Sequence, residues 1–340
     1  MYRCSFLCFV LVAASACGSS ATPTSPTSPA SVSETHAILL GQTVDAVTGA
    51  ATANVMVQAP GGLTATSDAN GLFQLDANSG SIRARLQGSG IVDRDATLRL
   101  DASGRTRLSL IPSTFDLAAF DEMFRASRAR LQRWTTRPSL VIIASVMDYQ
   151  ADADSDVATA ERMNDDEVAR MTADLTEGLT LLTGGTFTSF ASVEVERPSA
   201  GVRVPVLRTG KIVVGRYNGV ATEPGRVGYG RWFESSDGSI AGGAVFLDAR
   251  FDQSDTRRRL LRIHELGHAL GYNHVTKRPS IMNAMIGTEP TDFDRAAAVI
   301  AFQRPIGNQS PDVDPDTVRA MSVGGTAGWS EPKESSVFSR

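Results

Sequence analysis

Three histidines and a glutamate close to residue 270 have the types and spacing of a catalytic metal site. His264 and His268 are four residues apart, so on a helix their imidazoles project from one face, one turn apart, and can share one ion. Glu265 lies beside that face, where it can take a proton from water without being a ligand. Gly271 permits the positive φ that ends a helix, and His274 then supplies a third nitrogen three residues later.

The chemistry that this donor set supports is hydrolysis without a covalent intermediate. Three neutral imidazoles leave the fourth position of a zinc ion open to water, as in catalytic sites and not in closed structural ones. One Zn²⁺ lowers the pKa of such a water from about 15.7 toward about 7 and polarises a peptide carbonyl. Glu265 is expected to accept the proton during attack and to deliver it to the leaving amine.

An amphipathic helix must position these residues. Over residues 256–271 the apolar side chains recur at helical spacing and form one stripe: Leu260, Leu261, Ile263, Leu266 and Leu270. Further helices are predicted at residues 116–134, at 165–182 with Asn164 as the cap, and at 293–303. Strands are predicted at residues 139–147, 187–195, 211–217, 227–233 and 240–247. Helices before and between strands, followed by the long helix, indicate an α+β domain over residues 113–308.

The pattern HExxHxxGxxH from His264 to His274 resembles the extended motif of the metzincin zinc metallopeptidases. Downstream, the segment SIMN around Met282 is similar to the Met-turn that this family places under the zinc. The resemblance implies a metzincin-like catalytic domain, in which a twisted sheet lies over an active-site helix. It also implies a lower subdomain that holds the Met-turn and a final helix.

The same resemblance implies that residues 239–247 form the edge strand at the upper rim of the cleft. An extended substrate would pair with this strand at Gly242, Gly243 and Ala244, where the glycines admit another backbone. Two positions depart from the family pattern. Val275 follows the third histidine, and Ala284 stands where astacin- and serralysin-like enzymes carry a tyrosine that stabilises the transition state, so the subfamily and the oxyanion-stabilising group are not assigned.

Residues 35–112 predict a separate, small all-β sandwich, because short alternating runs are punctuated by turn residues. Segments 41–49 and 66–75 resemble the carboxypeptidase regulatory-like β-sandwich, a transthyretin-like module. Within the second segment, Asp-Ala-Asn-Gly at residues 68–71 is a turn signal. Phe73 is the only aromatic side chain between His36 and Pro112, so a structural spacer or folding aid is favoured over a carbohydrate- or protein-binding module.

The N-terminus resembles a bacterial export signal. A short apolar run over residues 6–14 is followed by small residues, so residues 1–16 are predicted to be a signal peptide. The segment ASAC resembles a lipobox, which makes Cys17 the candidate lipid-bearing residue, with ordinary cleavage after Ala16 as the alternative. Residues 17–34, rich in Ser, Thr and Pro, predict a flexible tether. We expect export from a bacterial cell and a lipid anchor at the cell surface or outer membrane, or otherwise secretion.

The charge distribution excludes two classes of partner. The net charge is −4, and its acids and bases are interspersed without the basic stripe that nucleic acid or an anionic membrane surface requires. The expected partners are protein or peptide substrates, and a membrane only through the lipid anchor. No cysteine follows Cys17, so no disulfide is expected in the exported protein.

Four aspartates in the middle of the chain form an acidic run. Asp148, Asp152, Asp154 and Asp156 resemble a calcium loop but lack its glycine and glutamate, so a solvated loop is favoured over calcium. Residues 309–340 predict a partly disordered tail, with residues 308–316 able to wrap the domain.

The predicted function is a zinc endopeptidase. The alternative is a non-catalytic surface binding protein in which zinc braces the fold.

Overall fold

The computed structural model describes residues 37–77, 81–99, 105–150, 155–220 and 226–316. In this part of the chain the protein is a mixed α/β structure with several sheets and few helices. The predicted signal peptide, the predicted tether with Cys17, Asp152, Asp154 and the tail beyond residue 316 lie outside the described residues. None of the described helices is long and apolar enough to cross a membrane.

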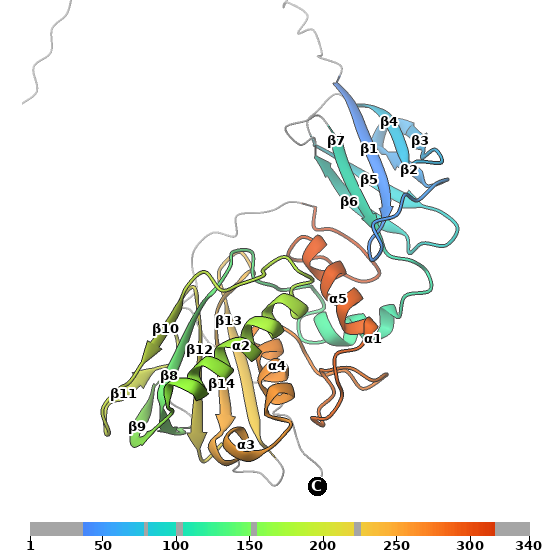
Figure 1. Cartoon of the computed structure of the whole chain (residues 1–340). Helices are drawn as coiled ribbons and strands as arrows, with labels where there is room; N and C mark the ends of the chain where they lie inside the picture. Colours follow the sequence, from blue (N-terminus) through green and yellow to red (C-terminus); the bar gives the residue numbers. More distant parts are fainter. Residues whose placement is uncertain (1–36, 78–80, 100–104, 151–154, 221–225, 317–340) are drawn as a thin grey trace, which may run out of the picture. The chain divides into compact units, whose positions relative to one another are not determined.

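Two sheets with a shared core make up the first part of the chain (Figure 1), where the sequence predicts a sandwich. Their strand orders are β4-β1-β7 and β3-β2-β5-β6. The strands are β1 (Ala37–Asp45), β2 (Met56–Ala59), β3 (Leu63–Thr66), β4 (Leu72–Ala77), β5 (Ser81–Gln87), β6 (Arg94–Arg99) and β7 (Arg105–Leu110), and a short 3-10 turn (Pro60–Gly62) joins β2 to β3. Alternate side chains point inward and form the core between the sheets.

The turn before β4 follows the sequence prediction. One carboxylate oxygen of Asp68 accepts hydrogen bonds from the N–H groups of Asn70 and Leu72, both at 2.8 Å. Gly71 has a φ of +71°, and a Cβ there would lie 2.2 Å from the carbonyl oxygen of Thr43. The turn therefore requires glycine for both its conformation and its close packing.

A seven-stranded sheet forms the framework of the second part. Its order is β11-β9-β8-β12-β14-β13, and β10 pairs with the first half of β8. The strands are β8 (Ser139–Asp148), β9 (Ser155–Arg162), β10 (Val193–Glu196), β11 (Arg203–Pro205), β12 (Lys211–Asn218), β13 (Gly228–Glu234) and β14 (Ile240–Asp248). β8, β12 and β14 are parallel and buried on both faces, which explains their nearly continuous apolar sequences.

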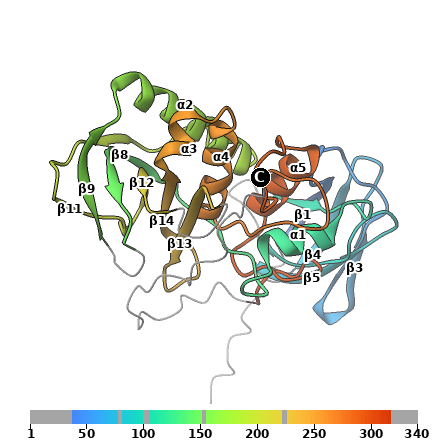
Figure 2. The same cartoon turned by 90° about the horizontal axis from the view of Figure 1, so that it is seen from below.

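Two helices, α2 (Asp165–Leu182) and α4 (Arg258–Ala269), lie together on one face of this sheet (Figure 1 and Figure 2). The other helices are α1 (Leu117–Phe124), α3 (Ala249–Ser254) and α5 (Asp292–Gln303). The predictions for α2, including its Asn164 cap, and for α5 are confirmed. Gly178 of α2 allows the close approach, because a Cβ there would lie 3.1 Å from Ile263 and Leu266 of α4.

The helix predicted at residues 116–134 is wrong in length, since α1 ends at Phe124. The reason lies in the segment that follows α5. The N–H of Leu131 donates to the carbonyl of Asn308 at 2.8 Å, and the N–H of Gly307 donates back to Leu131 at 2.9 Å. These bonds, and burial of Leu131 and Trp134 against the rest of the core, outweigh continuation of the helix.

Two strand predictions also need correction. The strand predicted at residues 187–195 is shorter and begins at Val193. The strand predicted to be the edge, β14, is interior, because it pairs with β12 on one side and β13 on the other. In the described part of the sheet β13 is the strand at that edge.

Candidate metal centre

Helix α4 carries two of the three predicted metal ligands. Every residue from Leu260 to Ala269 is buried, because α4 packs between α2 and the strands β13 and β14. The helix ends as predicted: Gly271 has a φ of +99°, and the N–H of Tyr272 donates to the carbonyl of Gly267 at 3.0 Å. This reversal turns the chain back toward the face that bears His264 and His268.

The structure brings all three predicted ligands together. The Nε2 atoms of His264 and His268 are 3.2 Å apart, and that of His274 lies 3.2 Å from the first and 3.1 Å from the second. Among the described residues, these three form a group whose potential ligand atoms lie within 4.8 Å of one another. The group contains three ligands, as catalytic zinc sites do, and not the four of a closed structural site.

Backbone carbonyls set the orientation of two of the rings. Nδ1 of His264 lies 2.7 Å from the carbonyl oxygen of Ile281, and Nδ1 of His268 lies 2.8 Å from that of Tyr272. A carbonyl oxygen only accepts, so each Nδ1 must carry the proton. Burial, and secondarily the neighbouring His274, lowers the pKa of His264 to about 3 and that of His268 well below its usual value. Both rings are therefore neutral and turn Nε2 lone pairs inward.

This donor set fits a zinc ion. Two lone pairs at 3.2 Å, from His264 and His268, have no proton to share and repel one another unless a cation accepts both. Two nitrogens bound at about 2.0–2.1 Å to one tetrahedral zinc lie about 3.3–3.4 Å apart. The observed separations are close to that value. The residues present thus fit the metal that the sequence predicts.

Glu265 lies between α4 and the edge strand β13. Its side chain is fully buried, and a Cβ placed on Gly228 would lie 2.4 Å from its Oε1. Two residues on, a Cβ on Gly230 would lie 2.3 Å from the Glu265 carbonyl and 2.6 Å from Cβ of His268. These two glycines, on the same face of β13, permit the strand to contact α4 directly.

Met282 is buried beneath α4. A Cβ on Gly267 would lie 2.5 Å from the Met282 sulfur, so this glycine, between the two histidines of α4, makes room for the side chain. The carbonyl of Met282 accepts the N–H of Val275 at 2.9 Å. The segment predicted to be a Met-turn thus contacts both the helix and the loop that carries His274.

Asp294, at the start of α5, contributes to the site and was not predicted. It is fully buried and accepts hydrogen bonds from the Ser280 hydroxyl and, at 3.1 Å, from the N–H of Ile281. The carbonyl of the same Ile281 orients His264. The capping-box arrangement with Thr291 was a signal for the helix start, but sequence spacing does not show that this acid reaches across to residues 280–281.

A buried ion network behind α4 was also not predicted. Asp252 of α3 is fully buried and receives two hydrogen bonds of 2.7 Å from Arg262 and one of 2.7 Å from Arg216. Arg262 further donates to Asp174 of α2, and Arg216 to Glu167. An arginine two residues before the first histidine was the available signal, since a buried charge requires partners.

Other predicted site residues lie elsewhere. Gly242 and Gly243 are not at the cleft rim: they admit Phe233 and Ala269, because a Cβ on them would lie 2.1 Å and 3.0 Å from those side chains. Ala244 pairs on both sides within the sheet. In the acidic run, the Asp148 side chain accepts from Asn218, while Asp156 is buried and accepts the N–H of Gln150.

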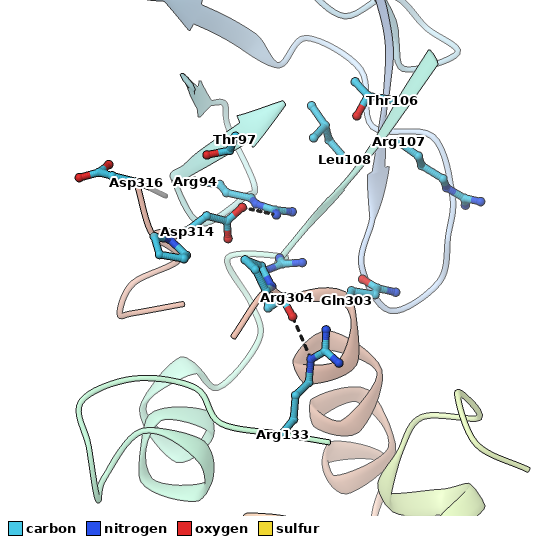
Figure 3. Close-up of a pocket in the computed structure, with 12 residues that line it drawn as sticks. Arg94, Thr97, Thr106, Arg107, Leu108, Arg133, Gln303, Arg304, Asp314 and Asp316 are labelled. Atoms are coloured by element: carbon cyan, nitrogen blue, oxygen red, sulfur yellow. Dashed lines mark hydrogen bonds and ion pairs between the residues drawn. The ribbon is translucent and has the colours of Figure 1, made fainter. Parts of the chain in front are cut away.

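A cavity of about 340 Å³ is lined by none of the motif residues. Figure 3 shows arginines from β6 and from the end of α5 around it, with Arg94 bonded to Asp314. Arg304 makes a bidentate pair with Asp312 at 2.7 Å, and the carbonyl of Arg304 accepts from Arg133 at 3.0 Å. These polar groups are bonded to one another. The cavity is therefore lined by an ion cluster that connects the sandwich to the segment after α5.

No protein-family model matches the sequence of this chain, and no curated protein matches it significantly.

Proposed function

We propose that this protein is a zinc-dependent endopeptidase with a metzincin-like catalytic domain, which hydrolyses peptide bonds in protein substrates. The observation that carries the proposal is the triangle of Nε2 atoms of His264, His268 and His274, separated by 3.1 and 3.2 Å. The helix that supplies two of them also bears a buried glutamate, Glu265. Met282 packed under this helix supports the family assignment.

The three imidazoles would hold the ion, and Glu265 would move the proton. When bound, zinc lowers the pKa of water and polarises the scissile carbonyl. The carboxylate of Glu265 would accept a proton from the attacking water and donate it to the leaving amine. Its burial between α4 and β13 limits screening by solvent, which strengthens its electrostatic effect on the reacting atoms.

The edge strand β13 is the proposed docking site for substrate, in place of β14. Within the described sheet it pairs only with β14, and Gly228 and Gly230 hold it against α4 next to Glu265 and His268. An extended peptide could add to this edge by backbone hydrogen bonds, which recognise conformation more than sequence. We further propose that residues 1–16 are a signal peptide that places the enzyme outside the cytoplasm, anchored through Cys17 or secreted.

The test is a zinc measurement combined with a cleavage assay on the protein from Ser31 onward. We expect about one zinc per chain and cleavage of unfolded proteins such as casein. The Glu265→Ala variant is expected to retain zinc and to lose at least about 100-fold in activity, because general-base catalysis supplies about 10²–10⁴-fold. Removal of zinc by a chelator should abolish cleavage, and added zinc should restore it.

Two results would contradict the mechanism: a metal-free protein that cleaves substrate, or a Glu265→Ala variant with wild-type activity. A zinc-loaded protein that cleaves nothing in a broad peptide library would favour the non-catalytic binding protein instead. Metal analysis of a variant with His274→Ala serves as the control for the ligand set, since it removes one nitrogen of the triangle.

A further inference from the structure

The loop that carries the third histidine is attached to α1, a helix that precedes the seven-stranded sheet. The N–H of Asn273 donates to the carbonyl of Met123 at 2.8 Å, and its side-chain amide donates to the same oxygen at 3.0 Å. Met123 lies in the last turn of α1, where helix carbonyls lack partners within the helix. Asn273 therefore satisfies the end of α1 and fixes the chain just before His274.

Glu122 of the same helix fixes the chain just after His274. One carboxylate oxygen accepts the N–H groups of Thr276 and Lys277, at 3.0 and 3.3 Å, and the other accepts the Thr276 hydroxyl. A single side chain thus takes three donors from two consecutive residues. Hydrogen bonds to a charged acceptor are about twice as strong as neutral ones.

On its other side the loop is bonded to the segment that contains Met282. The N–H of Val275 donates to the Met282 carbonyl at 2.9 Å, and the Val275 carbonyl accepts from the Asn283 side chain at 2.7 Å. The residues that flank His274 are therefore held by two different elements. A shift of α1 would act on Asn273, Thr276 and Lys277, which are bonded to it. It would not act directly on the bonds of Val275 to Met282 and Asn283.

The backbone of the first two ligands is positioned differently from that of the third. His264 and His268 lie inside α4, where the helix itself fixes their spacing. His274 lies in a segment without regular secondary structure, so its position depends on the bonds of its neighbours. Groups that hold a ligand in place affect how well a site retains its metal, so the bonds on either side of His274 should affect zinc retention.

We propose that Glu122 is a positioning residue for the third metal ligand, and that α1 sets how firmly the site retains zinc. This inference rests on the proposed zinc site and adds a residue outside the motif that affects how firmly zinc is retained. Glu122 is partly exposed, so its replacement removes the three hydrogen bonds without opening the core.

The experiment measures zinc release from the full chain into an excess of a chromophoric chelator. We expect Glu122→Ala to release zinc about 10–100-fold faster than the wild type, the usual effect of removing a group that orients a ligand. Because the three lost hydrogen bonds are exposed, the unfolding midpoint of the metal-free protein should fall only slightly. Glu122→Gln keeps an acceptor oxygen for Thr276 and should restore most of the retention.

The matched control is Glu196→Ala, which breaks an ion pair of 2.6 Å with Arg208 and should release zinc at the wild-type rate. The proposal is overturned if Glu122→Ala and the wild type release zinc equally fast, or if Glu196→Ala accelerates release as much. A wild-type protein that binds no zinc overturns this proposal together with the proposed function. If the wild type binds zinc and Glu122→Ala releases it at the wild-type rate, only the proposal about Glu122 is overturned.

Discussion

At the scale of single residues, two backbone carbonyls set which nitrogen carries the proton in two imidazoles of the candidate metal centre. The carbonyls of Ile281 and Tyr272 fix the protons of His264 and His268 on Nδ1. Burial keeps both rings neutral at ordinary pH by lowering their pKa values. The nitrogens that face the centre are therefore free of protons, so zinc binding at neutral pH does not have to displace a proton from either ring.

Asp156, on the face of the sheet opposite α4, is a described residue whose charge state should change stability with pH. Burial is the largest cause that raises its pKa from 3.8 to about 6, although the N–H of Gln150 and the charge of Arg231 act in the opposite direction. The folded state thus holds this proton more tightly than the unfolded state. Its contribution is fully favourable below pH 3.8 and is lost as the pH rises through about 6.

The Asp156→Asn variant tests this linkage, because the amide keeps an acceptor for Gln150 but does not ionise. Urea unfolding at several pH values should show the wild type losing stability relative to the variant between pH 3.8 and about 6. Above that window the difference should stay constant. Parallel curves for the two proteins across the whole range would show that Asp156 has a normal pKa.

At the scale of elements, the contact of α4 with β13 determines how Glu265 and His268 are held. The two glycines of β13 differ in what they touch. A Cβ on Gly228 would meet the far ends of the Glu265 and Leu261 side chains, whereas a Cβ on Gly230 would meet the backbone of Glu265 and Cβ of His268. Side-chain ends can move and backbone cannot, so the two positions should respond differently to the same substitution.

Gly228→Ala should displace the Glu265 carboxylate and reduce kcat, while zinc content and stability remain near wild type. Gly230→Ala should push β13 away from α4, and we expect a loss of about 1–3 kcal/mol in the free energy of unfolding together with weaker zinc retention. Cleavage kinetics, zinc analysis and urea unfolding on both variants separate these effects. Gly88→Ala is the control, since its Cβ would make ordinary contacts of 3.5 Å or more. Identical behaviour of the two β13 variants would argue against this division of roles.

At the scale of the whole described chain, the segment after α5 links elements that are far apart in sequence. Asp314 pairs with Arg94 of β6 at 2.9 Å, and Asp312 pairs with Arg304 at the end of α5. Asn308 accepts a hydrogen bond from Arg125, which follows α1. The part of the expected tail that is described, residues 309–316, therefore wraps the fold through buried polar contacts.

Asp312→Ala should destabilise the fold strongly, because it leaves the guanidinium of Arg304, which is fully buried, without its bidentate partner. Breaking one side of a buried pair costs about 3–5 kcal/mol. Asp316→Ala on the same segment is the control: its side chain is 93% exposed and its contact with Arg83 is 3.5 Å long. The control should change the free energy of unfolding by less than about 0.5 kcal/mol. Equal urea midpoints for the two variants would mean that the cluster does not hold the fold together.

Some features of this protein follow from its sequence alone, because they depend on residues close together in the chain. The spacing of His264, His268 and His274, the end of α4 at Gly271, and α2 with its Asn164 cap are set by the period of the helix and by local hydrogen bonds. The structure brings the three ligands together as that spacing predicts.

Other features were decided only by the tertiary structure. Strand order is not encoded in any one segment, so β13 and not β14 is the edge, and Gly242 and Gly243 serve internal packing. The helix α1 stops early because the residues beyond it bond to the segment after α5: Arg125 donates to Asn308, 183 positions further along the chain. The role inferred for Glu122 also depends on the tertiary structure. Its three donors come from a loop 154 and 155 residues further along the chain, and only folding brings them within hydrogen-bonding distance.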